Sequence, residues 1–273
     1  MKPMTKPSIP QSISEQLGTI HTMTFPEQGC TSQVAILHTD KGRSVLKKSI
    51  GEQYAAWLKQ EAYVLGCLAT INGNASTTQL RVPEVYHFLQ CQDQDEGLQA
   101  WLLMEAIEGD TVYHALTGEH NPAKQNEILF VFGRSLRQLH DTPCPAELQT
   151  DKKWLDHILE QAQYNLTHYE VDGSAALLQH LQQNRPTDVQ QTLIHGDCTM
   201  DNVLIDQGQI TGMIDWSGGA WGDPRYDIAL AIESIAELPQ AEQGYEAFFA
   251  GYGERMISDQ DYDYFQKGLY EFF

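Results

Sequence analysis

Apolar residues in the first part of the chain form short runs that are separated by Gly, Asp and Pro. Runs of this length, rich in β-branched and aromatic residues, are typical of strands. We expect strands over residues 17–25, 33–39, 42–48, 85–89 and 98–104. Between the third and fourth runs, residues 53–71 carry apolar side chains at helical spacing, which predicts one long helix.

After residue 110 the apolar spacing becomes predominantly helical. A stripe of Ile, Leu and Phe along residues 125–140 is typical of a helix that packs on a core. The same reasoning predicts helices over residues 112–116, 153–169, 175–183 and 228–236. Two short apolar runs, residues 203–205 and 209–214, flank a Gly turn and predict a hairpin.

Length and composition restrict the class of protein. A chain of 273 residues with 41% hydrophobic residues can form one large domain or two lobes. No apolar run approaches 18 residues, so no transmembrane helix is expected. The Pro-rich start lacks the apolar segment of a secretory signal, and we expect residues 1–16 to be a flexible lead-in. Five scattered cysteines without a C-x-x-C pair suggest neither zinc nor disulfides, which favours a cytoplasmic location.

The net charge of −20, from 17 basic and 37 acidic residues, argues against a nucleic-acid partner. An acidic cleft can concentrate positively charged ligands, so a cationic small molecule fits this charge. Simple solubility is the other reading of the same charge.

The candidate catalytic and metal-binding residues lie in residues 193–216. Asp197 precedes Asn202 by five positions, which is the spacing of a kinase catalytic loop, where the Asp accepts the substrate's hydroxyl proton. Asp215 follows the predicted hairpin and is the expected main ligand of Mg²⁺, with Asn202 as the second ligand. We expect His195 to hold this loop through hydrogen bonds. The alternative is an ordinary acidic loop followed by a hairpin.

Three motifs together resemble the aminoglycoside phosphotransferase family. They are H-G-D-x-x-x-x-N at residues 195–202, I-D-W at residues 214–216 and G-D-P-R-Y-D-I-A at residues 222–229. The resemblance covers about residues 17–273 and implies an α+β, bilobal, protein-kinase-like fold. It implies a β-rich N-lobe over residues 17–107 and a mostly helical C-lobe over residues 108–273.

The resemblance also implies which residues bind the nucleotide. Lys47 matches the family's phosphate-binding lysine, and strand alternation places Lys48 on the opposite, solvent-facing side. Glu61 matches the helix glutamate that holds this lysine, with Glu52 as its nearest rival. The turn before the second strand offers phosphate contacts from Thr31 and Ser32. The remaining nucleotide contacts are expected from the interlobe linker and from the residue before Asp215: Met104, Glu105, Ile107 and Ile214.

Other family positions are expected to be structural or to face the acceptor. By this match Asp227, at the start of a helix, supports the catalytic loop, and His140 is structural. The Gly-rich residues 217–222 are expected to form an exposed loop on the acceptor side. Asp156 and Glu160 are candidates for contacting the acceptor, although the favoured interpretation is that they are solvent-exposed acids on a helix.

The acidic C-terminal stretch resembles the branch that acts on the 3′-hydroxyl of kanamycin-type aminoglycosides. That match implies that Glu237, Glu271 and the carboxylate of Phe273 face the ammonium groups of the acceptor. The chain departs from that branch at Tyr270, where an acid is usual, and in the loop over residues 198–201.

We therefore expect a kinase that transfers the γ-phosphoryl group of ATP or GTP to a hydroxyl of an aminoglycoside, with Mg²⁺ as cofactor. Metabolic kinases of choline, homoserine, sugars or fructosamines, and macrolide kinases, remain alternatives. A nucleotide-binding protein without catalysis and a magnesium-dependent hydrolase are the alternatives of other kinds. The expected partner is a cationic small molecule, with no nucleic acid or membrane, and the expected state is a monomer or weak dimer.

Overall fold

The computed structural model describes residues 4–26, 31–72 and 81–273, and its N-terminal part is a five-stranded antiparallel sheet. The strand order is β1-β2-β3-β5-β4. The strands are β1 (Ile20–Thr24), β2 (Gln33–Thr39), β3 (Gly42–Ile50), β4 (Val85–Asp93) and β5 (Gly97–Glu105). We call the part up to Glu105 the N-terminal lobe and the part from Asp110 onward the C-terminal lobe.

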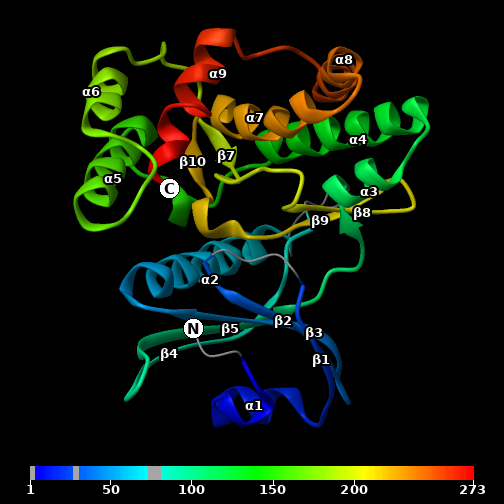
Figure 1. Cartoon of the computed structure of the whole chain (residues 1–273), viewed down its shortest axis with the longest axis vertical. Helices are drawn as coiled ribbons and strands as arrows, with labels where there is room; N and C mark the ends of the chain where they lie inside the picture. The colour runs from blue at the N-terminus through cyan, green and yellow to red at the C-terminus, as the bar shows by residue number, and fades with distance from the viewer. Residues whose placement is uncertain (1–3, 27–30, 73–80) are drawn as a thin grey trace.

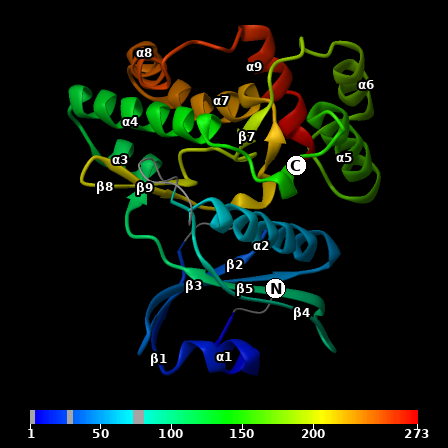
Figure 2. The ribbon, with the colours of Figure 1, turned by 180° about the vertical axis from the view of Figure 1, so that it is seen from behind.

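Both faces of this sheet are covered by a helix (Figures 1 and 2). On β5, Trp101 and Leu103 pack with helix α1 (Gln11–Leu17), while Leu102 and Met104 join the core beneath helix α2 (Glu52–Asn72). Alternate side chains of a strand point to opposite faces, so a strand that is covered twice needs apolar residues at successive positions. This explains the continuous apolar run in β5.

The expectation of a flexible lead-in over residues 1–16 is wrong for residues 4–16, and residues 1–3 lie outside the described part. A 3₁₀ turn, η1 (Lys6–Ser8), leads into α1. Met4, Ile9, Ile13 and Leu17 are buried against the outer face of the sheet. The apolar stripe of α1 therefore belongs to the core, and the first strand begins at Ile20 rather than at residue 17.

The C-terminal lobe is mostly helical (Figure 1). Its α-helices are α3 (Val112–Gly118), α4 (Pro122–Asp141), α5 (Trp154–His168), α6 (Ala175–Gln183), α7 (Pro224–Glu233), α8 (Ala241–Tyr252) and α9 (Asp259–Phe265). Its short 3₁₀ segments are η2 (Ala146–Leu148), η3 (Trp216–Gly218), η4 (Ser234–Glu237) and η5 (Leu269–Phe272). Most of the predicted helices are confirmed within a few residues.

The C-terminal lobe also contains two small sheets. Strands β6 (Asp110–Thr111), β8 (Val203–Asp206) and β9 (Gln209–Met213) form one, and β7 (Thr192–Ile194) pairs with β10 (Ala220–Gly222) in the other. The predicted hairpin is therefore confirmed as β8–β9. Within the described ranges, no helix is long and apolar enough to cross a membrane.

Helix α7 begins four residues earlier than expected. Asp223 is its N-cap, accepting a hydrogen bond from the backbone N–H of Arg225, and Pro224 occupies the first helical position. Asp and Pro in this order are a common start of a helix. Asp227 therefore lies inside the first turn of α7 rather than at its start.

Candidate active site

The Asp197 carboxylate lies in the loop between β7 and β8 and is held from two sides. The Asn202 amide donates to its Oδ2 and to the Asp197 carbonyl, each at 2.8 Å. The Tyr270 hydroxyl donates to Oδ1 at 3.0 Å. Burial raises the pKa of Asp197, and the hydrogen bonds from Tyr270 and Asn202 oppose this rise by favouring the ionised carboxylate.

The backbone of the loop over residues 195–202, which we call the catalytic loop after the role expected of it, is held by the fully buried Asp227 of α7. Its carboxylate accepts hydrogen bonds from the backbone N–H of His195 at 2.6 Å and of Gly196 at 2.8 Å. His140 of α4 makes a third contact to it at 3.2 Å through Nε2. A buried carboxylate requires such partners, so Asp227 and His140 have the structural roles that were expected of them.

His195 connects the loop to the β8–β9 hairpin. Its Nε2 lies 2.8 Å from the Ile214 carbonyl oxygen, which only accepts hydrogen bonds, so Nε2 carries the proton. Its Nδ1 is then the acceptor for the Asp197 backbone N–H at 3.2 Å. The imidazole ring also lies 4.4 Å from the ring of Trp216, between centroids. His195 thus supports the loop, as the sequence predicts.

Gly196 is required by the path of the loop. Its φ is +79°, and an added Cβ would lie 2.1 Å from the carbonyl oxygen of Gly218. The backbones of the catalytic loop and of η3 therefore touch at this point. Residues 217–222 were expected to form an exposed loop. Ser217 and Gly218 are exposed, but Gly219 and Gly222 are buried and Ala220–Gly222 pairs with β7. Glycine permits the close packing at the two buried positions.

The hairpin brings the two expected Mg²⁺ ligands to its open end. Asn202 precedes β8 and Asp215 follows β9, and the Ile214 N–H donates to the Asn202 carbonyl at 2.9 Å. Asp215 has the left-handed backbone conformation, with φ 64° and ψ 59°. Non-glycine residues adopt it rarely, Asp and Asn more often than most, and it is found at functional sites.

The donor set at this end of the hairpin suits Mg²⁺. The Asn202 amide nitrogen is occupied by Asp197, which leaves the amide oxygen of Asn202 as a ligand. The Asp215 side chain is 44% exposed, so its carboxylate is accessible. Mg²⁺ prefers such oxygens in combination with the phosphates of a nucleotide.

Lys47 of β3 joins both lobes. Its ammonium is buried, lies 2.6 Å from Glu61 Oε1 on α2 and also contacts the Asp215 carboxylate. Burial by itself lowers the pKa of a lysine, but the charges of Asp215 and Glu61 outweigh it and raise the pKa of Lys47. The expected pairing with Glu61 is therefore present, whereas the rival Glu52 is exposed at the first turn of α2.

The expectation that Lys48 faces solvent is wrong. Its side chain points to the opposite face of β3 from Lys47, but that face is covered, and Lys48 is only 3% exposed. The ammonium lies 2.5 Å from Glu96 Oε2 and 5.2 Å from the centre of the Trp101 ring. A buried lysine needs such a partner, and here the β4–β5 hairpin supplies it.

The other predicted nucleotide contacts lie along the edge between the lobes. Met104 is buried in β5, and Glu105 uses its backbone N–H for the Glu84 carbonyl at 2.8 Å, which leaves the Glu105 carbonyl as the group it can offer. Ile107 is buried, close to the β9 backbone. The Ser32 hydroxyl lies 2.6 Å from that of Ser49 on β3. Thr31 is half-buried beside it, and residues 27–30 of the same turn lie outside the described part.

Of the residues predicted to face the acceptor, some lie near Asp197 and others do not. Glu271 and Phe273 belong to the C-terminal segment that carries Tyr270 to Asp197. Glu237 is exposed at the end of η4, which packs on α7 and α8, and no hydrogen bond or ion pair joins it to the described residues of the site. Asp156 and Glu160 form ion pairs with Arg185 and Lys152, in agreement with the favoured reading of solvated helix acids.

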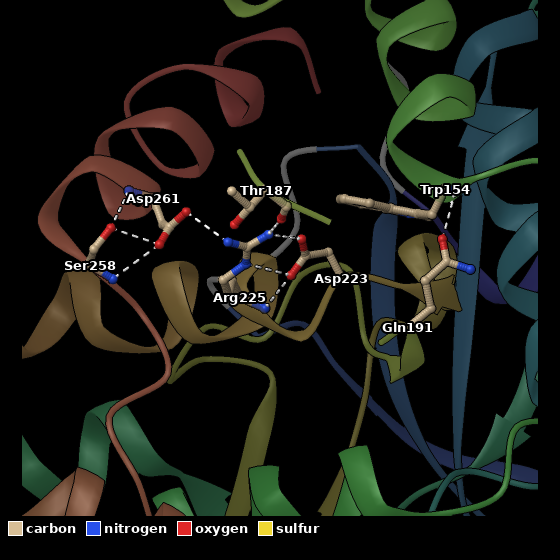
Figure 3. A network of polar contacts seen from close by, with 7 residues as sticks. All are labelled: Trp154, Thr187, Gln191, Asp223, Arg225, Ser258 and Asp261. Carbon is tan, nitrogen blue, oxygen red and sulfur yellow. Dashed lines mark hydrogen bonds and ion pairs between the residues drawn. The ribbon is translucent and has the colours of Figure 1, made fainter. Parts of the chain in front are cut away.

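A buried arginine in α7 connects α9 to the rest of the lobe (Figure 3). Arg225 is 4% exposed and binds the Asp223 carboxylate, the Asp261 carboxylate of α9 at 2.8 Å and the Thr187 carbonyl at 2.7 Å. Sequence reasoning did not assign a role to Arg225 or place Tyr270 at Asp197. The Asp-Pro pair before Arg225 could have located the start of α7, but no sequence signal joins Tyr270 to a loop 73 residues away.

Comparison with known proteins identifies the family to which this chain belongs. The model of the phosphotransferase enzyme family matches residues 22–266. An aminoglycoside 3′-phosphotransferase of Escherichia coli is 27% identical over 192 residues, which cover 66% of this chain and 66% of that protein. A homoserine kinase of Neisseria meningitidis serogroup B is 30% identical over 167 residues, covering 55% of this chain and 52% of that protein. The chain thus spans less than two thirds of these relatives' own length.

The fold is also similar to that of solved structures. A thermostable mutant of aminoglycoside phosphotransferase APH(4)-Ia, in ternary complex with AMP-PNP and hygromycin B, superimposes with a TM-score of 0.65 at 19% identity. That comparison covers 94% of this chain and 87% of the other. The bilobal, kinase-like α+β fold is therefore confirmed. Because the family model covers most of the chain, the chain belongs to the phosphotransferase enzyme family.

Proposed function

We propose that this protein is a small-molecule kinase that transfers the γ-phosphoryl group of ATP or GTP to a hydroxyl of an aminoglycoside. The observation that carries the proposal is the contact of one buried lysine, Lys47, with both Glu61 of α2 and Asp215 after β9. A lysine paired with a helix glutamate, next to a metal-binding aspartate, is the phosphate-binding arrangement of kinases.

In the proposed reaction, Asp197 orients the acceptor hydroxyl and accepts its proton. Asn202 and Asp215 would hold Mg²⁺, which neutralises charge on the β- and γ-phosphates when it is bound. Lys47, positioned by Glu61, binds the phosphates as a cation. Because the transition state of phosphoryl transfer is loose, the positions and charges of these groups supply most of the acceleration.

An aminoglycoside acceptor is supported by charge and by the location of the C-terminal segment. The chain carries a net charge of −20, which favours a polycationic ligand. Glu271 is half-buried next to Tyr270, whose hydroxyl reaches Asp197, so Glu271 and Phe273 are proposed to face the ammonium groups of the acceptor. The relatives named aminoglycoside 3′-phosphotransferase support the 3′-hydroxyl as the target.

Homoserine is the second candidate acceptor, since a homoserine kinase is 30% identical over 167 residues. It is a small zwitterion and requires a partner for its carboxylate as well as for its single ammonium. Net charge therefore favours the aminoglycoside.

A coupled assay of ADP or GDP release tests the proposal. Purified protein with Mg²⁺ and either ATP or GTP is supplied with kanamycin-type aminoglycosides, a macrolide, choline and homoserine in turn. Asp197→Ala serves as the blank, because this change removes the proposed base and should lower turnover by orders of magnitude while nucleotide binding persists. Nucleotide binding is measured separately by calorimetry.

Turnover with an aminoglycoside that is absent from the blank supports the proposed reaction. Turnover with homoserine and none with aminoglycosides would identify homoserine as the acceptor and would still support the proposed kinase reaction. Near-normal turnover of Asp197→Ala with an accepted substrate would contradict the role of Asp197.

A further inference from the structure

Each oxygen of the Asp197 carboxylate accepts a hydrogen bond from a side chain of the protein. Asn202 donates to Oδ2 at 2.8 Å, and the Tyr270 hydroxyl donates to Oδ1 at 3.0 Å. A general base orients its substrate by accepting a hydrogen bond from the hydroxyl that loses a proton. Asn202 also binds the Asp197 carbonyl and is therefore held in place, so Oδ1 is the oxygen that can receive the acceptor hydroxyl if Asp197 has the proposed function. Tyr270 thus donates to this oxygen as an acceptor hydroxyl would.

The backbone of the two residues that follow Tyr270 is held in place by hydrogen bonds. The Glu271 carbonyl accepts a hydrogen bond from the Gly173 N–H at 2.8 Å, and the Phe272 carbonyl accepts one from the Asn165 amide at 2.8 Å. Asn165 and Phe272 are both fully buried. The hydroxyl of Tyr270 therefore reaches Asp197 from a fixed backbone, and Figures 1 and 2 show this segment next to α5 and β10.

Without the Tyr270 hydroxyl, Oδ1 of Asp197 would be free to bind a water molecule. Water bound to Asp197 would be oriented and deprotonated in the same way as an acceptor hydroxyl, and it would hydrolyse the nucleotide. The Tyr270 hydroxyl takes the hydrogen-bonding position of that water, and its aromatic ring adds apolar surface beside it.

We propose that Tyr270 is a positioning residue that orients the Asp197 carboxylate through Oδ1 and excludes water from this oxygen until the acceptor hydroxyl takes its place. The inference rests on the proposed function, but it concerns the choice between acceptor and water, which can be measured without knowing the acceptor. It predicts that loss of the Tyr270 hydroxyl uncouples nucleotide hydrolysis from transfer.

Tyr270→Phe removes the hydroxyl and keeps the ring. The vacated position next to a carboxylate is polar and can hold a water molecule. With Mg²⁺ and ATP but no acceptor, release of ADP should rise on the order of tenfold, a small part of the 10²–10⁴ that general bases contribute. The ratio of phosphoryl transfer to hydrolysis should fall by a similar factor with any accepted substrate.

Tyr264→Phe is the matched control. Tyr264 is buried in α9, in the same C-terminal region, and its hydroxyl donates to the Leu181 carbonyl at 3.1 Å rather than to Asp197. Any general loosening of this region should affect both variants, whereas the transfer-to-hydrolysis ratio should change only in Tyr270→Phe. In an Asp197→Asn background, Tyr270→Phe should no longer raise hydrolysis, because the base that activates the water is absent.

Three results would overturn the inference. The first is unchanged acceptor-independent hydrolysis in a Tyr270→Phe protein that melts at the wild-type temperature. The second is an equal rise in the Tyr264→Phe control or in the Asp197→Asn background. The third is phosphate on Tyr270 of the wild-type protein by mass spectrometry, which would make this tyrosine a substrate. A failure of all aminoglycosides as acceptors would contradict the proposed function and leave the hydrolysis comparison interpretable.

Discussion

At the scale of single residues, the site depends on charges that are buried in pairs. Lys47 is 5% exposed, and two carboxylates raise the pKa of its ammonium despite this burial. It therefore remains protonated throughout the physiological pH range. A permanently charged, fixed ammonium suits the binding of phosphate.

Replacing Glu61 with Gln should weaken the positioning of Lys47. A charge-assisted hydrogen bond contributes about 1.5–3 kcal/mol, so kcat/KM for the nucleotide should fall by about 10- to 100-fold. Glu52→Gln, at the exposed start of the same helix, is the matched control and should behave as wild type. Steady-state kinetics with varied nucleotide test this, and equal effects of the two substitutions would contradict the assignment of Glu61.

Two buried cysteines should be unreactive in the native protein. Burial raises the pKa of Cys144 to about 11 and that of Cys198, in the catalytic loop, well above its usual value. The thiolate is the reactive form, and at pH 8 roughly one Cys144 thiol in a thousand is ionised. Reactivity should rise with pH toward the raised pKa.

Peptide mapping after a short treatment with iodoacetamide at pH 8 measures this reactivity. Cys144 and Cys198 should be modified only after unfolding in guanidinium. Rapid labelling of either thiol in the native state would show that its surroundings are more open than the structure has them.

At the scale of elements, the least expected feature is α1. Its signal was present in the sequence, because Ile9, Ile13 and Leu17 recur every four residues and form one helical face. The prolines at positions 3, 7 and 10 outweighed that spacing and led to the expectation of a flexible lead-in. The structure shows that α1 completes the core on the outer face of the sheet.

Ile13→Ala should therefore destabilise the protein. Ile13 is fully buried, and removal of a buried Ile side chain costs about 2–5 kcal/mol in the free energy of unfolding. Gln16→Ala, on the exposed side of the same helix, is the control. Urea unfolding measures both variants, and a wild-type midpoint for Ile13→Ala would mean that α1 does not pack as described.

The catalytic loop makes an equally specific prediction at Gly196. Gly196→Ala combines a φ of +79° with a Cβ only 2.1 Å from the Gly218 carbonyl, so the loop has to move. A displacement of about 1 Å can cost on the order of 100-fold in rate, and turnover should fall by at least that factor. Circular dichroism and a turnover assay report fold and function separately.

Gly208 supplies the control for backbone strain. Its φ is +75°, but no atom lies within 4 Å of an added Cβ. Gly208→Ala should cost about 1–2 kcal/mol of stability from its conformation alone and keep normal turnover. Normal turnover of Gly196→Ala would show that the contact with Gly218 can relax.

At the scale of the whole molecule, what could be predicted depended on distance along the chain. Asp197, Asn202 and Asp215 lie within one short stretch, and the spacing of that stretch predicts the loop and the hairpin that bring them together. The pairing of Lys47 with Glu61 was inferred from a resemblance and is present in the structure. The Mg²⁺ and nucleotide roles of these residues remain predictions.

What failed to be predicted depends on packing between distant segments. Lys48 was expected in solvent because strand alternation does not show that a helix covers the second face of the sheet. Residues 219–222 were expected to be exposed because the sequence does not show that residues 220–222 pair with β7. Tyr270 reaches Asp197 across 73 residues of chain, so only the fold reveals this contact.

The most direct test of the central claim is the product formed from kanamycin A with Mg²⁺ and ATP, identified by mass spectrometry and phosphorus NMR. A 3′-deoxy analogue and the Asp197→Asn variant serve as controls. The account predicts one phosphoryl group on kanamycin A, attached at the 3′-hydroxyl, with no product from either control. Unmodified kanamycin A in the presence of wild-type protein that binds ATP would contradict it.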